Sequence, residues 1–187
     1  KAVAEGRDVI NLGQGNPDQP TPDHIVKALS SAAKNPQSHK YSPFRGINEL
    51  KQAAVDFYAR EYNVNLDPDT EVAILFGTKI GLVELPLASM NENELMLLPD
   101  PGYPDYLSGI GLANVQFETM PLLEENGFLP DYEQLSTEQK EAAKLMYLNY
   151  PNNPTGASAT SEFFQETVDL AKENGIAVVH DFAYGGI

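Results

Sequence analysis

The sequence contains no cysteine, and its three histidines, His24, His39 and His180, are far apart along the chain. The lack of cysteine excludes disulfide frameworks, thiolate metal sites, iron–sulfur clusters and cysteine nucleophiles. It fits a reducing compartment, so we expect a cytoplasmic protein. Because the histidines also lack the spacing of metal ligands, no metal site is expected.

Basic residues are scarce, since 12 Lys and Arg stand against 27 Asp and Glu, a formal charge of −15 at pH 7. An acidic surface repels phosphate backbones and lacks the basic clusters that bind anionic lipid, so we expect neither nucleic-acid nor membrane partners. No apolar run reaches the ~20 residues that span a bilayer. With 42% hydrophobic residues over 187 positions, the chain can form the core of one domain of about average size.

Three segments have the pattern of amphipathic helices. Thr21-Pro22-Asp23 is typical of a helix start, with a hydroxyl N-cap, proline at the first helical position and an acid in the first turn. A second helix is expected from about Ile47 to Tyr62, where apolar residues follow helical spacing. A third is expected from about Ser161 to Asn174, and Gly175 should end it.

Five short apolar runs are predicted to be strands: 71–76, 95–98, 115–120, 145–148 and 176–179. A helix to about Met90 should follow the first run, and a short helix should follow the second. Because helical segments rather than hairpin turns connect these runs, we expect βαβ crossovers and a mostly parallel sheet. The predicted fold class is α/β, and in such sheets ligands bind beyond the carboxyl ends of the strands.

Four strand ends carry residues with unusual chemistry, and all four should face one crevice. They are Gly77-Thr78-Lys79, Pro101-Gly102-Tyr103, Asn152-Asn153-Pro154, and Asp181 with Tyr184.

From the residues alone, each of these ends has two interpretations. Gly77-Thr78-Lys79 offers amides, a hydroxyl and a cation to a phosphate, or it forms a plain turn from strand to helix. Tyr103 stacks on a flat ligand or covers the sheet end, and Asn153 is a ligand donor or a turn former before proline. Asp181 closes an apolar run, so it is either a surface acid or the partner of a ligand cation, with Tyr184 adding a phenol.

The glycines Gly13 and Gly15 do not form a nucleotide motif. A third glycine of the dinucleotide fingerprint would fall at Asp18, and Pro17 interrupts the helix that should begin there. The phosphate-binding P-loop pattern is also absent. The two glycines therefore form either a turn at a strand end or a close approach of the backbone to a ligand.

Six segments, in this order, resemble the class I/II aminotransferases of the fold-type I pyridoxal-phosphate enzymes. They are Asn11–Asp18, Lys40–Gly46, Gly77–Lys79, Asp100–Pro104, Asn149–Gly156 and Asp181–Tyr184. The resemblance covers essentially the whole chain and implies the three-layer α/β/α large domain of that fold, truncated. It implies that residues 1–40 are an N-terminal segment, part of a small domain and the entry to the large domain. Residues 41–187 would form the cofactor-binding large domain, incomplete at its C-terminus.

The resemblance implies a contact with the cofactor, pyridoxal 5′-phosphate, for most of the candidate residues. Gly77, Thr78 and Lys79 would hold its phosphate, and Tyr103 would stack on its pyridine ring. Asn153 and Tyr184 would donate to its phenolic O3′. Asp181 would pair with the pyridinium nitrogen and keep it protonated, so that the ring can act as an electron sink.

Two further residues receive roles from the same resemblance. Gly15 would lie near the carboxylate of the substrate. Tyr41 would reach the cofactor phosphate of a partner subunit, which implies a homodimer.

The chain lacks two residues that the family needs for catalysis. The Schiff-base lysine of the family lies in a Ser-x-x-Lys or similar stretch after the Asp-x-x-Tyr motif, whereas the last lysine here is Lys172. Lys79 lies near the phosphate site and is not assigned that role. The family arginine that binds the substrate α-carboxylate lies later still. We therefore expect an N-terminal portion of an aminotransferase, inactive by itself, whose catalytic lysine lies beyond Ile187.

The predicted function of the full-length protein is the transfer of an amino group between an amino acid and a 2-keto acid. Within the family, the sequence looks similar to the methionine-salvage transaminases, which aminate 2-keto-4-methylthiobutyrate. Two alternatives share the same cofactor cradle: a pyridoxal-phosphate lyase of the same fold, and a non-catalytic sensor domain that binds the cofactor.

Overall fold

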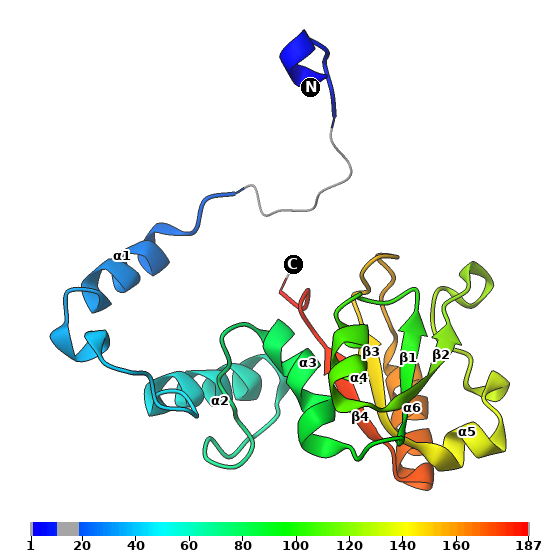
Figure 1. Ribbon diagram of the computed structural model, residues 1–187. Helices are drawn as coiled ribbons and strands as arrows, with labels where there is room; N and C mark the ends of the chain where they lie inside the picture. The colour runs from blue at the N-terminus through cyan, green and yellow to red at the C-terminus, as the bar shows by residue number, and fades with distance from the viewer. Residues whose placement is uncertain (1, 11–18, 187) are drawn as a thin grey trace.

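A parallel sheet forms the centre of the computed structural model, which describes residues 2–10 and 19–186 (Figure 1). Its strands are β1 Leu95–Asp100, β2 Gln116–Pro121, β3 Ala143–Asn149 and β4 Ala177–Asp181. The sheet has four strands in the order β2-β1-β3-β4, and every neighbouring pair is parallel. The mostly parallel sheet predicted from the sequence is therefore confirmed.

Six α-helices precede or connect these strands within the described residues. They are α1 Asp23–Ala32, α2 Asn48–Tyr62, α3 Thr78–Ser89, α4 Tyr106–Ala113, α5 Thr137–Ala142 and α6 Ser161–Asn174. Short 3-10 helices are η1 Val3–Glu5, η2 Pro36–His39, η3 Glu124–Asn126 and η4 Tyr132–Gln134. None of the described helices has both the length and the apolar character that a membrane crossing requires.

Helices cover both faces of the sheet, so the expected α/β/α arrangement is confirmed (Figure 1). Side chains alternate along the strands, because successive residues of a strand point to opposite faces. Leu97 of β1 and Met146 of β3 pack in the cluster that includes Phe163 of α6. Met96 and Tyr147, their neighbours in sequence, pack in the cluster formed with α3 and α4.

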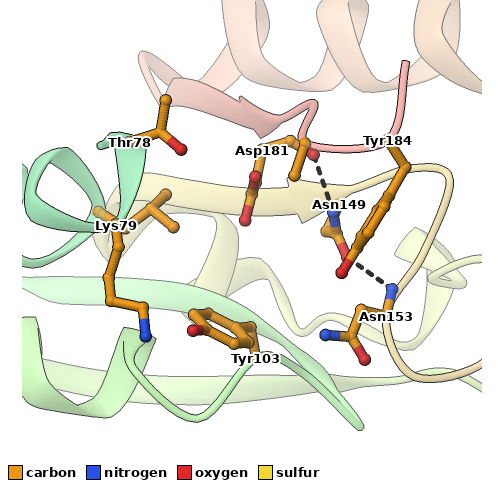
Figure 2. Close-up of a pocket in the computed structure, with 9 residues that line it drawn as sticks. Thr78, Lys79, Tyr103, Asn149, Asn153, Asp181 and Tyr184 are labelled. Atoms are coloured by element: carbon orange, nitrogen blue, oxygen red, sulfur yellow. Dashed lines mark hydrogen bonds between the residues drawn. The ribbon is translucent and has the colours of Figure 1, made fainter. Parts of the chain in front are cut away.

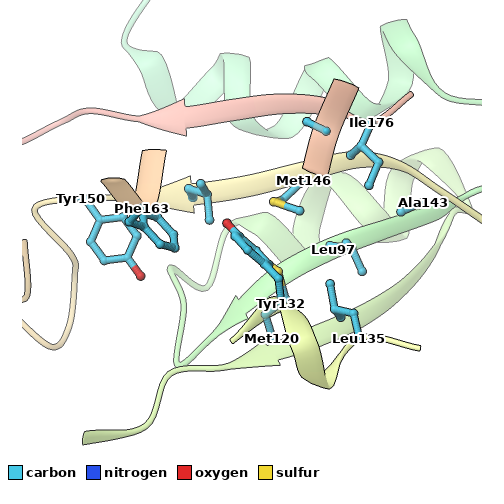
Figure 3. Packing of buried hydrophobic residues seen from close by; sticks show 11 residues of the cluster. Leu97, Met120, Tyr132, Leu135, Ala143, Met146, Tyr150, Phe163 and Ile176 are labelled. Atoms are coloured by element: carbon cyan, nitrogen blue, oxygen red, sulfur yellow. The ribbon is translucent and has the colours of Figure 1, made fainter. Parts of the chain in front are cut away.

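The cluster beneath α6 is largely apolar and includes a short hydrogen-bond chain (Figure 3). The rings of Tyr132 and Phe163 stack, with centroids 5.7 Å apart. The Thr167 hydroxyl donates to the main-chain oxygen of Phe163 at 2.9 Å, so the Tyr132 hydroxyl donates to Thr167 at 2.8 Å. Each fully buried side chain of this size contributes about 1.5–3 kcal/mol, and the chain leaves neither hydroxyl unpaired.

On the opposite face, α3 and α4 approach each other closely because of a glycine. A Cβ atom at Gly109 of α4 would lie 2.9 Å from the main-chain oxygen of Val83 in α3. No side chain fits at that distance from a backbone carbonyl. Gly109 therefore fixes the depth at which α4 packs, and α4 carries Tyr106 at its first position.

Two sequence predictions about local structure are wrong. The predicted strand over residues 71–76 is absent, since this segment pairs with no strand in the described chain, and Phe76 at its end is 88% exposed. An apolar run predicts burial, but it does not supply the neighbouring strand whose hydrogen bonds make a ladder. Thr21 does not cap α1, because the helix begins at Asp23 and its N-cap, Pro22, makes no side-chain cap bond.

The other element predictions are confirmed to within a few residues. In particular, α6 begins after Thr160, whose hydroxyl accepts from the Phe163 amide, and ends at Gly175 with φ +69°. Sequence reasoning missed α5, a helix of 6 residues with a capping box between Ser136 and Gln139. Its shortness hides the helical period, although the capping signature was visible.

Candidate active site

A cavity of about 210 Å³ lies beyond the carboxyl ends of β3 and β4, beside the first residues of α3 (Figure 2). Its lining residues are Thr78, Lys79, Leu82, Tyr103, Asn149, Asn153, Asp181, Ala183 and Tyr184. Six of these are candidates from the sequence: Thr78, Lys79, Tyr103, Asn153, Asp181 and Tyr184. Residues of all four predicted segments therefore line one crevice, although residues 71–76, which precede Gly77, form no strand.

The first turn of α3 forms one end of this cavity. Gly77 is the N-cap, and its φ of +87° is a conformation that side-chain-bearing residues rarely adopt. Gly77 itself is not among the lining residues; it turns the chain so that Thr78 and Lys79 begin the helix at the cavity. Amides in the first turn of a helix have no intrahelical partner, and the helix dipole favours an anion there.

The Lys79 side chain is engaged with neighbours at the cavity mouth. Its ammonium lies 2.9 Å from Oδ2 of Asp105 and 5.4 Å from the centroid of the Tyr103 ring. The Tyr103 phenol and the Asp105 carboxylate raise the pKa of Lys79, so this lysine stays charged. The contact with Lys79 correspondingly lowers the pKa of Asp105.

Asp181 is the last residue of β4 and faces the cavity from its inner end (Figure 2). Oδ2 of Asp181 accepts a hydrogen bond from the buried Tyr106 hydroxyl at 3.0 Å. Tyr184 follows three residues later and lines the same cavity. In Figure 2, Asp181, Tyr184 and the Tyr103 ring border a common space.

Asn149, the last residue of β3, ties the strand end to the turn that follows it. Its Nδ2 donates to the main-chain oxygen of Asp181 at 2.9 Å, and its Oδ1 accepts from the Asn153 amide at 2.7 Å (Figure 2). Sequence reasoning assigned no role to Asn149. The available signal was an amide side chain at the end of an otherwise apolar strand.

The turn between β3 and α6 is built around Asn152 rather than Asn153. The Asn152 side chain is buried, and its Oδ1 accepts from both the amide and the hydroxyl of Thr155, at 3.1 and 2.7 Å. Its Nδ2 donates to the main-chain oxygen of Asn149 at 3.1 Å. Because Asn152 performs the turn-forming role, the Asn153 side chain can line the cavity.

Comparison with known proteins identifies the family of this chain. Residues 7–187 match the family model Aminotransferase class I and II. The chain belongs to this family. The resemblance found in the sequence is thereby confirmed, as is the α/β fold of an aminotransferase domain.

Two relatives of this aminotransferase chain are enzymes of Bacillus subtilis. It is 63% identical, over all of its length and 47% of the other's, to an L-glutamine--4-(methylsulfanyl)-2-oxobutanoate aminotransferase. It is 54% identical, over 96% of its length and 45% of the other's, to transaminase BacF. Its structure matches the solved apo-BacF structure with a TM-score of 0.91 at 53% identity, covering 98% of this chain and 47% of that one. The chain thus spans about half the length of the curated relatives it matches.

Tyr41, a candidate residue of this aminotransferase chain, is not among the residues that line the cavity. Tyr41 lies in the loop before α2 and its side chain is fully exposed. Gly15, and with it the segment Asn11–Asp18, lies outside the described residues. Their predicted contacts with a partner subunit and with substrate stay predictions.

Proposed function

We propose that the full-length protein containing this chain is a pyridoxal-phosphate-dependent aminotransferase that moves an amino group between an amino acid and a 2-keto acid. The observation that carries the proposal is the cavity, which gathers six predicted cofactor residues from separate parts of the chain. They come from the start of α3, the β1–α4 loop, the β3–α6 turn and the end of β4. Membership of the aminotransferase family supports the same assignment.

The donor set fits pyridoxal phosphate group by group. The first turn of α3 offers amides and a favourable dipole to the phosphate. Tyr103 offers a ring face to the pyridine, and Asn153 and Tyr184 offer an amide and a phenol to the ring oxygen. Asp181 offers a carboxylate to a protonated ring nitrogen. An anion-binding helix end and a carboxylate on the same cavity suit a ligand that is anionic at one end and cationic at the other.

Lys79 would contact the phosphate through its main-chain amide. Its ammonium is already paired with the Asp105 carboxylate at 2.9 Å, so the side chain adds little net charge to the cavity mouth. Thr78 would contact the phosphate through both its hydroxyl and its main-chain amide. These contacts would orient the cofactor by its phosphate, and Tyr103 would hold the plane of its ring.

When bound, the cofactor supplies an electron sink for negative charge that develops on the substrate α-carbon. The residues of this chain would tune that sink. Asp181 would hold the proton on the pyridine nitrogen, and Asn153 and Tyr184 would donate to O3′.

The catalytic lysine and the arginine for the substrate α-carboxylate would come from outside this chain. No lysine follows Asp181 in the sequence, and the ammonium of Lys79 is paired with Asp105. The 187-residue chain alone is accordingly proposed to be inactive. Residues 41–187 would form most of the cofactor-binding domain. Residues 1–40 would belong partly to a smaller domain, which agrees with the absence of buried residues from α1.

Within this function, we propose 2-keto-4-methylthiobutyrate as an acceptor, which makes the product methionine. The support is the 63% identity to the Bacillus subtilis enzyme whose name specifies 4-(methylsulfanyl)-2-oxobutanoate, the same compound. The name of that relative also specifies L-glutamine, which becomes the first amino donor to test. We further propose a cytoplasmic homodimer, in which the exposed Tyr41 reaches the cofactor phosphate of the partner.

The test uses the full-length protein with pyridoxal phosphate, L-glutamine and 2-keto-4-methylthiobutyrate, and it measures methionine by mass spectrometry. We expect methionine to form only when donor and acceptor are both present. A lyase would release a keto acid and ammonia from the donor without any acceptor. A sensor domain would bind the cofactor and form neither product, and either result would overturn the proposal.

A matched pair of variants connects the activity to the cavity. Asp181→Ala should abolish methionine formation and weaken the binding of pyridoxal phosphate. Asp169→Ala, on the exposed face of α6, removes a carboxylate that accepts a hydrogen bond from Gln165 at 2.9 Å, and it should leave both unchanged. Equal activity of the two variants would contradict the assignment of Asp181.

A further inference from the structure

Tyr106 is a buried polar side chain that contacts Asp181 of the candidate site. It is the first residue of α4, only 1% of its surface is exposed, and it is not among the residues that line the cavity. Its hydroxyl reaches Oδ2 of Asp181, 75 residues later in the chain, at 3.0 Å. Tyr106 thus contacts the carboxylate from behind the cavity wall.

Two other aromatic rings hold Tyr106 in place. Its ring makes edge contacts with Tyr103, at a centroid distance of 5.8 Å, and with Tyr147 of β3, at 5.1 Å. Tyr147 is fully buried, and its hydroxyl donates to the main-chain oxygen of Leu82 in α3 at 2.8 Å. These contacts leave the Tyr106 ring little freedom to rotate away from Asp181.

The Tyr106 hydroxyl is a donor in this contact. Burial, together with the nearby Asp181 carboxylate, raises the pKa of Tyr106 far above its ordinary value, so the phenol keeps its proton. A carboxylate group with one oxygen that accepts such a bond is held in a preferred orientation. Asp181 sits at a strand end, where its main-chain oxygen is also held by Asn149. Main chain and side chain of Asp181 are therefore both fixed by hydrogen bonds.

We propose that Tyr106 is a positioning residue for the cofactor: it binds Oδ2 of Asp181 and so directs Oδ1 toward the ring nitrogen of pyridoxal phosphate. The inference rests on the proposed function, because it needs the cofactor to occupy the cavity. Through its edge contact with Tyr103, the same side chain also supports the ring that would stack on the cofactor. Tyr106 would thus couple the stacking residue to the carboxylate without touching the cofactor.

The test compares Tyr106→Phe with Tyr147→Phe in the full-length protein. Both variants remove one buried hydroxyl from the same aromatic cluster, but only the first removes a bond to Asp181. A hydrogen bond to a charged group contributes about 1.5–3 kcal/mol, so we expect Tyr106→Phe to weaken the binding of pyridoxal phosphate to the apoenzyme about 10-fold or more. Tyr147→Phe should weaken it less than about 3-fold, although both lower the thermal midpoint.

A second comparison shows whether Tyr106 acts through Asp181. In an Asp181→Ala background the hydroxyl has lost its acceptor, so adding Tyr106→Phe should change the dissociation constant of pyridoxal phosphate by less than about 2-fold. The pH profile of the bound cofactor's absorbance should shift in Tyr106→Phe and stay unchanged in Tyr147→Phe. If Tyr106 had only a structural role, the effect of Tyr106→Phe on cofactor affinity would not depend on Asp181. The pH profile would then not differ between Tyr106→Phe and Tyr147→Phe.

The outcomes separate this inference from the proposed function. If the wild-type protein binds no pyridoxal phosphate, the proposed function fails. If the wild type binds it and Tyr106→Phe binds it equally well, or if the two substitutions are additive, the positioning role is overturned. Should Tyr106→Phe not fold, the crystal structure of the wild-type holoenzyme decides: a Tyr106 hydroxyl turned away from Asp181 contradicts the proposal.

Discussion

Asn149 and Asp181 are paired residues at the carboxyl ends of β3 and β4, and the Asn149 side chain donates to the main-chain oxygen of Asp181 at 2.9 Å. The other end of the same amide accepts from the Asn153 backbone at 2.7 Å. One side chain therefore holds two residues of the candidate cofactor site at a fixed separation. Asn149 is therefore a structural residue of this site, although the sequence analysis assigns it no role.

We expect Asn149→Ala to destabilise the full-length protein and to weaken its affinity for pyridoxal phosphate. The substitution leaves the Asp181 oxygen and the Asn153 amide without their partner, which costs about 1–3 kcal/mol. Asn174→Ala is the control, because the Asn174 side chain donates to the Leu170 oxygen within α6 at 2.9 Å and is not among the residues that line the cavity. Urea unfolding and cofactor titration measure the two effects, and equal affinities in the two variants would contradict the prediction.

Two glycines in α4 should respond to alanine in opposite directions. In Gly109→Ala the new Cβ would meet the Val83 oxygen at 2.9 Å, so α4 must move away from α3. The free energy of unfolding should therefore fall by about 1–3 kcal/mol. At Gly111 a Cβ meets nothing within 4 Å, so alanine should stabilise the protein by about 0.5–1 kcal/mol. Chemical denaturation of both variants measures the difference, and the same sign for both would refute the packing argument.

The hydrogen-bond chain beneath α6 predicts an unequal effect of two small substitutions. Thr167→Val leaves the buried Tyr132 hydroxyl without an acceptor and should cost about 1–3 kcal/mol. Tyr132→Phe removes the outer donor only, and the Thr167 hydroxyl keeps its bond to the Phe163 oxygen, so the cost should stay near 1 kcal/mol. Urea midpoints rank the variants. The reverse order would show that the Tyr132 hydroxyl has another partner.

Alkaline pH should destabilise the fold through its buried tyrosines. Burial raises the pKa of Tyr147 to about 12, from an ordinary value of 10.0, and burial also raises the pKa of Tyr106, Tyr132 and Tyr150. Above pH 10 the unfolded chain loses these protons while the folded chain keeps them. The contribution of these tyrosines to the free energy of unfolding is therefore fully present below about pH 10. It falls as the pH rises toward 12, by up to about 1.4 kcal/mol per pH unit for each tyrosine.

The measurement is urea unfolding at a series of pH values, with tyrosinate absorbance followed in parallel. Tyr147→Phe should reduce the slope of stability against pH, because it removes one of the retained protons. A free energy of unfolding that stays constant between about pH 9 and about pH 11 would show that these phenols ionise equally well in the folded protein.

Sequence patterns were sufficient for most of the fold. The apolar runs near residues 95, 115, 145 and 176 became β1, β2, β3 and β4 of one parallel sheet. The two central strands, β1 and β3, are mostly buried, because a strand covered on both faces needs continuous apolar residues. The run at residues 71–76 has the same pattern and yet forms no strand in the described chain. Hydrophobicity predicts that a segment seeks burial, whereas a strand also needs a neighbour to share hydrogen bonds.

By itself, the sequence determined the fold class, the order of the motifs and the residues whose chemistry suits pyridoxal phosphate, because these depend on local pattern and residue type. Only the tertiary structure decided which side chains support them. The bond from Tyr106 to Asp181 joins residues 75 apart, and the one from Asn149 to Asp181 joins residues 32 apart. Such contacts depend on how strands align and how closely helices pack, and no local sequence pattern records either.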